Sequence, residues 1–335
     1  MSRTQKRIQN ILVVGGAGYV GSHVAKCLEK AGYNPVILDD LSTGHRKAAR
    51  SATFYQGHYG DRELLKSIFS KHSISAVMHF GAKALVGESV ADPLLYASSN
   101  IAGTIALLEG MRAANVNRFI FSSTCNVFGD PKEVPIHEGV QKLPVNPYGF
   151  SKFAVEQVLQ HMDQAYQFRS ASLRYFNAAG ADPEGELGED HRCETHLIPN
   201  AIRSLTGRSP ALTIFGNDYP TPDGTCIRDY VHVNDLASAH ISALELIDSQ
   251  NRSVDFNLGS EQGYSVNEVI HMLEKVSGKQ VPRKLGARRP GDAPRLVADS
   301  SKAKRELLWK TSFDLEAIVR TAYQWLAKNP EGYAS

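Results

Sequence analysis

Short apolar runs alternate with amphipathic stretches over the first half of the chain. Segments such as GSHVAKCLEKAG and NIAGTIALLEGMRAANV have the apolar spacing of helices. The runs between them are rich in β-branched and aromatic residues and predict strands: ILVVGG (11–16), PVILDD (35–40), ATFYQG (52–57), AVMHFG (76–81), RFIFSS (118–123) and ASLRYF (171–176). Continuous apolar strands separated by helices are typical of a parallel sheet covered on both faces. The pattern therefore predicts a doubly wound α/β domain.

The pattern changes after Phe176, where loops rich in Gly, Pro and Asp dominate and strands become sparse. The stretches VHVNDLASAHISALELI (231–247) and DFNLGS (255–260) again resemble the first half. A last helical segment, SFDLEAIVRTAYQWLAKNP, follows at 312–330. We therefore expect a first domain of residues 1–176 plus about 231–262. A smaller, discontinuous domain built largely from loops should comprise 177–230 and 263–335.

Glycines follow the first predicted strand in VVGGAGYVGSH, at Gly15, Gly18 and Gly21. Glycine permits a tight turn there, and the free N–H groups of the next helix attract a pyrophosphate. The second predicted strand ends at Asp39, whose carboxylate can accept hydrogen bonds from both ribose hydroxyls and would repel a 2′-phosphate. The sequence predicts a Rossmann-type site for NAD rather than NADP.

A tyrosine and a lysine lie one helical turn apart in NPYGFSK, at Tyr148 and Lys152, if a helix starts near Pro147. Alone, the pair is far more typical of a solvated surface helix than of a catalytic site. Beside a bound NAD, the Lys152 ammonium and the positive nicotinamide would lower the pKa of Tyr148, which is near 10 when free. Thr124 ends another predicted strand, at the sheet edge where ligands bind, and its hydroxyl could hold a substrate hydroxyl near Tyr148. Its alternative role is to satisfy loop backbone groups.

Composition narrows the class of protein. The 37 basic and 35 acidic residues give a net charge of +2, so neither nucleic acid nor a membrane surface is an expected partner. No apolar run reaches membrane-spanning length, and the first residues lack the apolar core of a signal peptide, which predicts a cytoplasmic protein. The cysteines are scattered (Cys27, Cys125, Cys193 and Cys226). Their spacing indicates neither a metal site nor a disulfide framework.

Taken together, the motifs resemble the extended short-chain dehydrogenase/reductase family, and within it the UDP-glucose 4-epimerases over essentially the full length. The general motifs are GGAGYVGSH, LVGESV and NPYGFSK. The specific ones belong to the sugar-nucleotide half: LRYFNAAGA, GEDHRCETHLIP, FGNDYPTPDGTCIRDYVHVNDLA and RRPGDAP. The resemblance implies a homodimer that epimerises a UDP-hexose through a transient 4-keto sugar.

The resemblance also implies roles for individual residues. It makes Thr124, Tyr148 and Lys152 catalytic. For NAD it implies Gly15, Gly18, Tyr19, Val20, Gly21, Asp39, Asp61, Asn100, Tyr148, Lys152 and Phe176. For the UDP-sugar it implies Thr124, Asn177, Leu197, Phe215, Arg228, Arg289, Asp292 and Leu296. Two guanidiniums on separate loops suit a diphosphate, although RRPGDAPR alone would also suit a solvated basic loop.

Several alternatives remain open at this point. A sugar-nucleotide dehydratase of the same superfamily needs an Asp-Glu pair after the catalytic Ser/Thr, and this chain has Cys125 and Asn126 there. A net dehydrogenase and a non-catalytic NAD-sensing protein are weaker alternatives. The sugar is also open, because glucose/galactose, their N-acetyl forms and xylose/arabinose share UDP and a 4-hydroxyl. The resemblance places Leu296 beside the sugar 2-substituent, although Leu296 could instead start a core strand.

Overall fold

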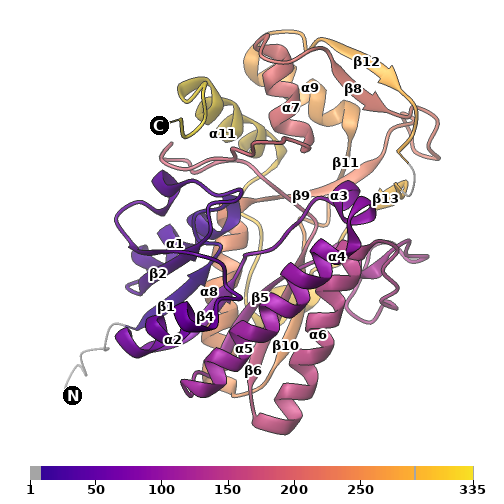
Figure 1. Cartoon of the computed structure of the whole chain (residues 1–335). Coiled ribbons are helices and arrows are strands. Elements are labelled where there is room, and N and C mark those ends of the chain that lie inside the picture. The colour runs from indigo at the N-terminus through magenta and orange to yellow at the C-terminus, as the bar shows by residue number, and fades with distance from the viewer. Residues whose placement is uncertain (1–8, 290–291, 335) are drawn as a thin grey trace, which may run out of the picture.

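The computed structural model describes residues 9–289 and 292–334, and its centre is a seven-stranded parallel sheet (Figure 1). The strand order is β10-β6-β5-β4-β1-β2-β3. These strands are β1 (Asn10–Val14), β2 (Asn34–Asp39), β3 (Thr53–Gln56), β4 (Ile74–His79), β5 (Arg118–Thr124), β6 (Arg169–Tyr175) and β10 (Val254–Leu258). The sequence prediction of a doubly wound α/β fold is confirmed, because each predicted run lies in this sheet.

Helices cover both faces of the sheet, since successive strand residues point to opposite sides. On β1, Ile11 and Val13 pack with α1 (Tyr19–Lys30) and α8 (Val233–Gln250). Leu12 and Val14 face the other side and pack with the remaining large helices. Those helices are α2 (Arg62–Lys71), α5 (Thr104–Ala113) and α6 (Pro147–Tyr166). Both faces of β1 are therefore buried, as its unbroken apolar run requires.

The direction of the strand order reverses next to β1. The chain runs from β1 outward to β2 and β3, and then returns to place β4 on the other side of β1. At such a switch point the connections diverge and leave a crevice at the carboxyl ends of the strands, where ligands bind. Gly15 follows β1 and Thr124 ends β5, so both predicted motifs lie along this edge.

Helix α6 starts where the sequence predicts it, at Pro147. The Asn146 side chain caps the helix by accepting a hydrogen bond of 2.8 Å from the Gly149 amide. Proline suits the first helical position because a backbone N–H there would have no partner within the helix.

The shorter helical elements before α6 are α3 (Val86–Ala91), α4 (Pro93–Tyr96), the π-helical η2 (Ala97–Gly103) and the 3₁₀ turns η1 (Arg46–Ala49) and η3 (Cys125–Phe128).

The second half of the chain contains more regular structure than the sequence predicts. Six short strands form two small sheets: β7 (Asn177–Ala179), β9 (Ile227–His232), β11 (Gly263–Ser265) and β13 (Arg295–Leu296) in one, and β8 (Leu212–Phe215) with β12 (Arg283–Gly286) in the other. Five of them have only two to four residues and lie among loops rich in Gly, Pro and Asp, so they carry little periodicity that could predict them. The prediction of a domain built largely from loops is therefore wrong in this respect.

A separate core holds this second unit together. Its helices are α7 (Leu197–Leu205), α9 (Val266–Ser277) and α11 (Leu315–Lys328), and α10 (Ser301–Glu306) lies beside β10. Figure 1 shows α7, α9, β8 and β12 together at one end of the main sheet. The return of α8 and β10 to the main sheet supports the expected domain division, which stays a prediction. No helix in the described part of the chain is long and apolar enough to span a bilayer.

Candidate active site

The glycine loop after β1 leaves no room for side chains. Gly15 has φ +74°, and a Cβ at Gly21 would lie 2.2 Å from the Gly15 carbonyl oxygen. Gly18 precedes the first residue of α1, and the first turn of α1 contains no acidic residue. The N–H groups at this helix start therefore face a site without a competing carboxylate in that turn. A pyrophosphate fits this backbone cradle, as the sequence predicts for NAD.

Asp39 closes the cradle from the end of β2. Its carboxylate accepts hydrogen bonds from the Ala17 amide at 2.9 Å and the Leu41 amide at 2.8 Å. Burial raises the pKa of Asp39, while these two bonds oppose the rise. Each carboxylate oxygen has a second lone pair, so the group can still accept from ribose hydroxyls. The structure thus adds a loop-bracing role to the predicted cofactor role.

Three further residues predicted for NAD lie around the same region. Tyr19 begins α1, and its hydroxyl donates to the Gly180 carbonyl at 2.6 Å, which links the glycine loop to the second half of the chain. Val20 follows it and packs on the core beneath α1. Phe176 is buried in a small cluster just after β6. Their contacts with NAD remain predictions.

Asp61 and Asn100 have structural partners in addition to their predicted cofactor role. Asp61 caps α2 by accepting from the Glu63 and Leu64 amides. The Asn100 amide is buried, and it pairs with both backbone groups of Lys83 at 2.9 Å and donates to Ser151 at 3.0 Å. Asn100 therefore holds the loop after β4 against α6, beside the predicted catalytic helix.

The structure brings Thr124, Tyr148 and Lys152 together at the carboxyl edge of β5. Lys152 is buried, and its Nζ donates to the Ser122 carbonyl of β5 at 2.8 Å. Burial lowers the pKa of Lys152 to about 7, although the Glu156 carboxylate partly opposes this. A buried ammonium one helical turn from a half-buried tyrosine is an arrangement suited to proton transfer rather than to a solvated helix face.

The protein environment of Tyr148 differs from the sequence expectation. Burial raises its pKa and the neighbouring Tyr175 adds to the rise, whereas a hydrogen bond with Thr124 lowers it. The sequence prediction of a lowered pKa applies beside bound NAD and stays a prediction, but it does not include the effect of lost water. The protein groups alone therefore keep Tyr148 protonated, and a further positive charge is needed to ionise it.

Asn126 holds the Thr124 hydroxyl in place. The Thr124 hydroxyl oxygen accepts from the Asn126 amide at 3.2 Å and from its side-chain nitrogen at 3.0 Å. Both acceptor positions are then used, so the hydroxyl proton remains for the Tyr148 oxygen. The Asn126 side-chain oxygen also accepts from Asn146 at 3.4 Å. This chain of amides connects Thr124 to the cap of the helix that carries Tyr148.

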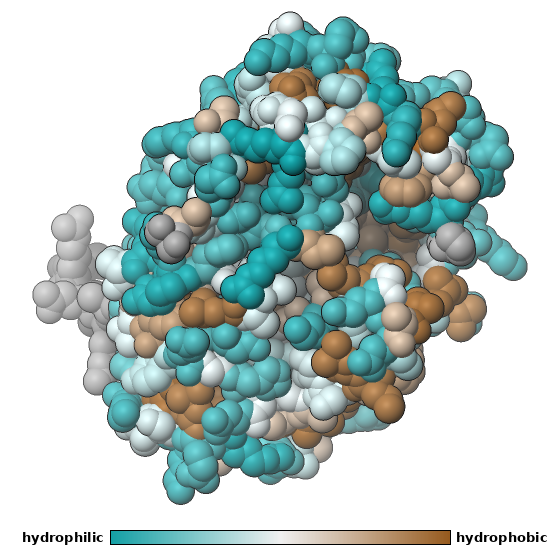
Figure 2. Space-filling model, turned by 45° about the horizontal axis from the view of Figure 1, so that its top comes forward, coloured by the Kyte–Doolittle hydropathy of each residue, from teal (hydrophilic) through white to brown (hydrophobic). Residues whose placement is uncertain are grey.

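Five residues predicted for the UDP-sugar lie on β8, β9 and β13 and in the segment between β12 and β13, and they form two sets of contacts. Arg228 donates to the Ala293 carbonyl at 2.8 Å and lies 3.4 Å from the Asp292 carboxylate. Leu296 pairs with Arg228 in register. The Arg289 guanidinium stacks over the Phe215 ring, 4.0 Å from its centroid. Figure 2 shows the surface hollowed between the part that carries β8 and β12 and the part that carries α3 and α4.

Leu296 joins this group to the catalytic edge, because it packs against the small buried cluster that contains Cys125, Phe128 and Phe176. Asn177 begins β7 beside Tyr230 of β9, and Leu197 begins α7. Among the described residues, neither Asn177 nor Leu197 shares a hydrogen bond or ion pair with Arg228 or Arg289. Their place in the site stays a prediction.

Sequence reasoning missed the supporting roles of Ser122 and Asn126. Ser122 lies within a predicted strand and contributes only its backbone carbonyl, so its side chain gives no signal.

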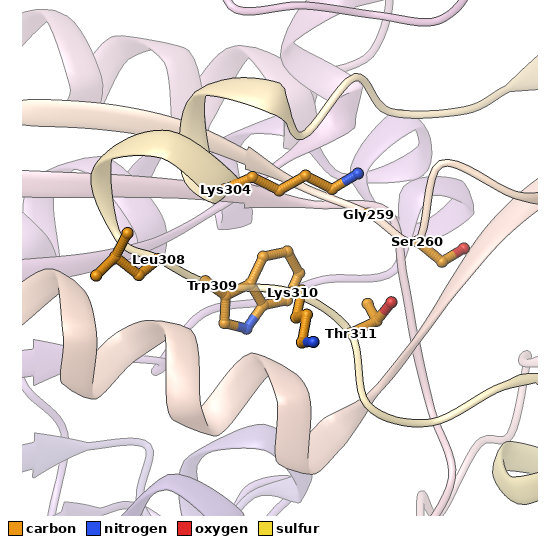
Figure 3. A pocket seen from close by; sticks show the side chains of 7 residues that line it. All are labelled: Gly259, Ser260, Lys304, Leu308, Trp309, Lys310 and Thr311. Carbon is orange, nitrogen blue, oxygen red and sulfur yellow. The ribbon is translucent and has the colours of Figure 1, made fainter.

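A separate hollow lies away from the predicted residues, between the end of β10 and the segment before α11 (Figure 3). It is lined by Gly259, Ser260, Lys304, Leu308, Trp309, Lys310 and Thr311. None of the predicted site residues lines it.

Comparisons with known proteins agree with this geometry. Residues 11–259 match the sequence profile of the NAD dependent epimerase/dehydratase family. The chain is 47% identical to the UDP-glucose 4-epimerase of Lacticaseibacillus casei, with 96% of this chain and 98% of that protein covered. It is 46% identical to the UDP-glucose 4-epimerase of Rhizobium leguminosarum bv. trifolii over 96% of this chain and 98% of that one.

Solved structures show the same similarity. The UDP-glucose 4-epimerase from Brucella ovis in complex with NAD superimposes with a TM-score of 0.92 at 46% identity, covering 94% of this chain and 98% of that one. The enzyme from Bifidobacterium longum in complex with NAD+ and UDP gives a TM-score of 0.92 at 37% identity, covering 97% and 100%.

The burial of Lys152 predicts a pH-dependent stability. Its pKa is about 7 in the folded chain and 10.5 when free, so the unfolded chain binds this proton more tightly. The contribution of Lys152 to the free energy of unfolding should therefore fall as pH decreases from about 10 to 7. The fall is roughly 1.4 kcal/mol for each unit by which the two pKa values differ. Lys152→Met lacks this component. Urea unfolding at both pH values should show the variant gaining stability relative to wild type as pH falls.

Lys66→Met, at an exposed position on α2, is the matched control and should give a difference that does not change with pH. Parallel stability curves for wild type and Lys152→Met would contradict the burial of a titrating ammonium. Lys152→Met also loses the hydrogen bond to the Ser122 carbonyl, which lowers the free energy of unfolding by the same amount at every pH. The test is therefore the change of the free energy of unfolding with pH.

Proposed function

Because the chain belongs to the NAD dependent epimerase/dehydratase family, we propose that it interconverts UDP-glucose and UDP-galactose by NAD-dependent 4-epimerisation. The observation that carries this proposal is the near full-length similarity to UDP-glucose 4-epimerases, among them the Brucella ovis and Bifidobacterium longum proteins whose solved structures hold NAD. Thr124, Tyr148 and Lys152 at the edge of β5 supply the groups that the reaction needs.

Tyr148 accepts the proton of the sugar 4-hydroxyl and later returns it. The Thr124 hydroxyl, held by Asn126, donates to the phenolate oxygen and so favours the ionised form. Lys152 in its charged form stabilises the same phenolate through space. Bound NAD would take up a hydride from C4, give it back, and add the positive ring charge that ionises Tyr148. The 4-keto sugar turns over between the two transfers and so presents its other face.

The two arginines hold the nucleotide while the sugar moves. Arg228 is fixed in place by the Ala293 carbonyl and Asp292, and it offers charge to the diphosphate. Arg289, stacked on Phe215, supplies a second guanidinium from another loop. Asn177 and Leu197 complete the proposed nucleotide site. Strong fixation of UDP with weak fixation of the sugar permits the half-turn that epimerisation requires.

The alternative functions lack support from specific residues. A dehydratase needs an acid and a base directly after Thr124, and the buried Cys125 and the hydrogen-bonded Asn126 are neither. A non-catalytic NAD-sensing protein has no need for a buried lysine one helical turn from a half-buried tyrosine. A net dehydrogenase would release NADH, which the test below detects.

Incubation of the purified protein with UDP-glucose or UDP-galactose, without added NAD or reductant, should produce a mixture of both. Tyr148→Phe should lower turnover roughly 10²–10⁴-fold with UDP affinity little changed, because the variant keeps the ring and loses the proton acceptor. Tyr166→Phe, at the exposed end of the same helix, is the matched control and should retain activity. Products are quantified by NMR.

Near-normal turnover of Tyr148→Phe would mean that a residue other than Tyr148 accepts the proton. Accumulation of free NADH would instead indicate a dehydrogenase. Recovery of NADP rather than NAD from the denatured protein would contradict the proposed role of Asp39.

Substrate breadth is proposed to depend on Leu296. Its side chain is partly buried: one part packs on the cluster around Phe128, and the remainder is accessible beside Arg228. A branched apolar side chain leaves more room next to the sugar 2-substituent than a phenol ring does. UDP-N-acetylglucosamine should therefore also be a substrate. UDP-xylose and UDP-arabinose, which share the 4-hydroxyl, complete the panel to be tried.

Leu296→Tyr should suppress turnover of UDP-N-acetylglucosamine relative to UDP-glucose. Shape discrimination in an apolar pocket is worth roughly 1–3 kcal/mol, so a shift of the ratio is expected rather than a complete switch. Leu296→Met conserves volume and should leave the ratio near its wild-type value. The ratio of kcat/KM values decides: an unchanged ratio in Leu296→Tyr contradicts the pocket assignment.

We also propose that the protein is a cytoplasmic homodimer. Exposed apolar side chains gather over α3, α4, η2 and α6, where an apolar groove is lined by Leu94, Ala97, Ile101, Val145 and Phe150 among others. Figure 2 shows apolar side chains on this side of the molecule. Leu94 is 79% and Phe150 56% exposed, which is costly for one chain alone. The four free cysteines are usual in a reducing compartment.

Light scattering should give wild type about twice the 36.7 kDa chain mass. The double variant Leu94→Glu/Phe150→Glu places charge in the apolar face and should be monomeric with an unchanged circular dichroism spectrum. Leu285→Glu, an exposed leucine on β12, is the control and should stay dimeric. A monomeric wild type would refute the proposal.

A further inference from the structure

Four side chains from the segment between β7 and α7 converge on one point. They are Glu189, His191, Glu194 and His196, and one ligand atom from each lies within 4.8 Å of all the others. Both carboxylates and both imidazoles contribute atoms that bind transition metals. We propose that this group of residues, here called the 189–196 cluster, is a binding site for a divalent transition-metal cation of the zinc class.

The distances within the cluster suit four-coordinate binding. The His191 Nδ1 lies 3.3 Å from the Glu189 carboxylate and 3.5 Å from the Glu194 carboxylate. The His196 Nδ1 lies 3.8 Å from Glu194 and hydrogen-bonds Glu189. A tetrahedral zinc with bonds of about 2.0–2.2 Å separates its ligands by roughly 3.3–3.5 Å. The two His191 distances match this spacing and the His196–Glu194 distance is slightly longer, whereas the His196–Glu189 hydrogen bond would have to open to admit the ion.

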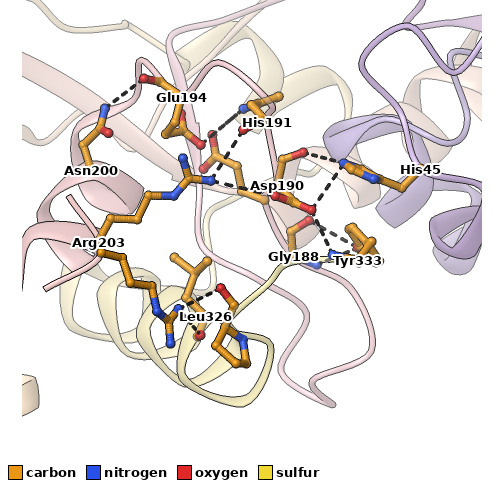
Figure 4. Close-up of polar contacts among 12 residues, drawn as sticks. His45, Gly188, Asp190, His191, Glu194, Asn200, Arg203, Leu326 and Tyr333 are labelled. Carbon is orange, nitrogen blue, oxygen red and sulfur yellow. Dashed lines mark hydrogen bonds and ion pairs between the residues drawn. The ribbon is translucent and has the colours of Figure 1, made fainter. Parts of the chain in front are cut away.

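The burial of Glu194 is a second observation, independent of the ligand spacing, that favours a bound cation. Its side chain is 1% exposed, and one carboxylate oxygen accepts from the Thr195 and His196 amides at 2.9 Å. The other oxygen is buried and has no hydrogen-bond partner among the described residues. It points toward the His191 ring, as Figure 4 shows. Within the described part of the chain, its only nearby charged group is the His191 ring, at 3.5 Å. Burying a carboxylate oxygen without a hydrogen bond is costly unless a cation neutralises it.

Supporting contacts fix the backbone of the cluster. The Asn200 side chain donates to the Glu194 carbonyl at 3.2 Å, and Arg203 donates to the His191 carbonyl at 3.4 Å, both from α7. The Asp190 carboxylate accepts from the Tyr333 amide at 2.8 Å, and His45 lies 3.3 Å from it (Figure 4). Ligands held by second contacts lose little freedom on binding, which favours a metal.

A metal in the cluster would join the two halves of the site. The Tyr19 ring lies edge-on to His191, with centroids 6.3 Å apart, and Leu197 follows His196 directly. Tyr19 belongs to the cofactor loop, and Leu197 to the proposed nucleotide site. The metal would therefore position Leu197 relative to the glycine loop and act on the KM for the UDP-sugar rather than on kcat. This last step rests on the proposed function, whereas metal binding itself does not.

A competing account needs no metal, because protonated histidines would pair with both glutamates in the same geometry. A metal titration distinguishes the two accounts, because only a metal site binds one equivalent of cation. Protein dialysed against a chelator is titrated with Co²⁺, whose visible spectrum reports tetrahedral coordination, and then with Zn²⁺. We expect one equivalent of metal per chain, a tetrahedral Co²⁺ spectrum that Zn²⁺ abolishes, and a higher melting temperature with either ion.

Glu194→Gln and His196→Gln should each weaken Zn²⁺ binding at least 10-fold, and the melting temperature of the metal-free variants shows whether they fold. His161→Gln, an exposed histidine on α6, is the control and should bind as wild type does. Absence of stoichiometric binding, or equal binding by both cluster variants and wild type, would overturn the proposal. Stoichiometric binding by a protein inactive on every UDP-sugar would support the site and refute the proposed function.

Discussion

The buried carboxylate of Asp229 ties together the segments on which the site depends. Asp229 is fully buried on β9, and its two oxygens accept from the Ser260 amide, the Ser260 hydroxyl, the Glu261 amide and the Ala298 amide at 2.6–3.1 Å. Hydrogen bonds to a charged group contribute roughly 1.5–3 kcal/mol each. These bonds join the end of β10, in the main sheet, to β9 and to the chain after β13. The register that places Leu296 beside Arg228 follows from this junction.

The catalytic edge shows the opposite use of burial. Lys152 is buried and Tyr148 is half-buried. Loss of water raises the pKa of Tyr148 and lowers that of Lys152, so the neutral form of each is favoured. This destabilises the charged states that the proposed reaction uses and leaves them responsive to a cofactor charge. Fixed polar groups then direct the protons: the Ser122 carbonyl positions the Lys152 ammonium, and Asn126 orients Thr124. The site is therefore arranged for reversible ionisation rather than for maximum stability.

Contacts between distant segments also explain how the second half of the chain is positioned. Tyr19 donates to Gly180, and buried Lys26 of α1 bonds Asp182 at 2.6 Å. The 189–196 cluster continues the same connection toward α7. The cofactor loop and the proposed nucleotide site thus share one polar framework, in which a metal ion would be a further link.

Local patterns in the sequence were sufficient for the main sheet, the glycine loop and the start of α6. Apolar runs, glycines directly after a strand and a proline at a helix start depend on neighbouring residues, so they can be recognised without the fold. The raised pKa of Tyr148, the support of Thr124 by Asn126, the short strands that align Arg228 with Leu296, and the 189–196 cluster were decided only by the tertiary structure. Each of these depends on lost water or on partners brought together by folding, and neither desolvation nor long-range proximity is encoded in local periodicity.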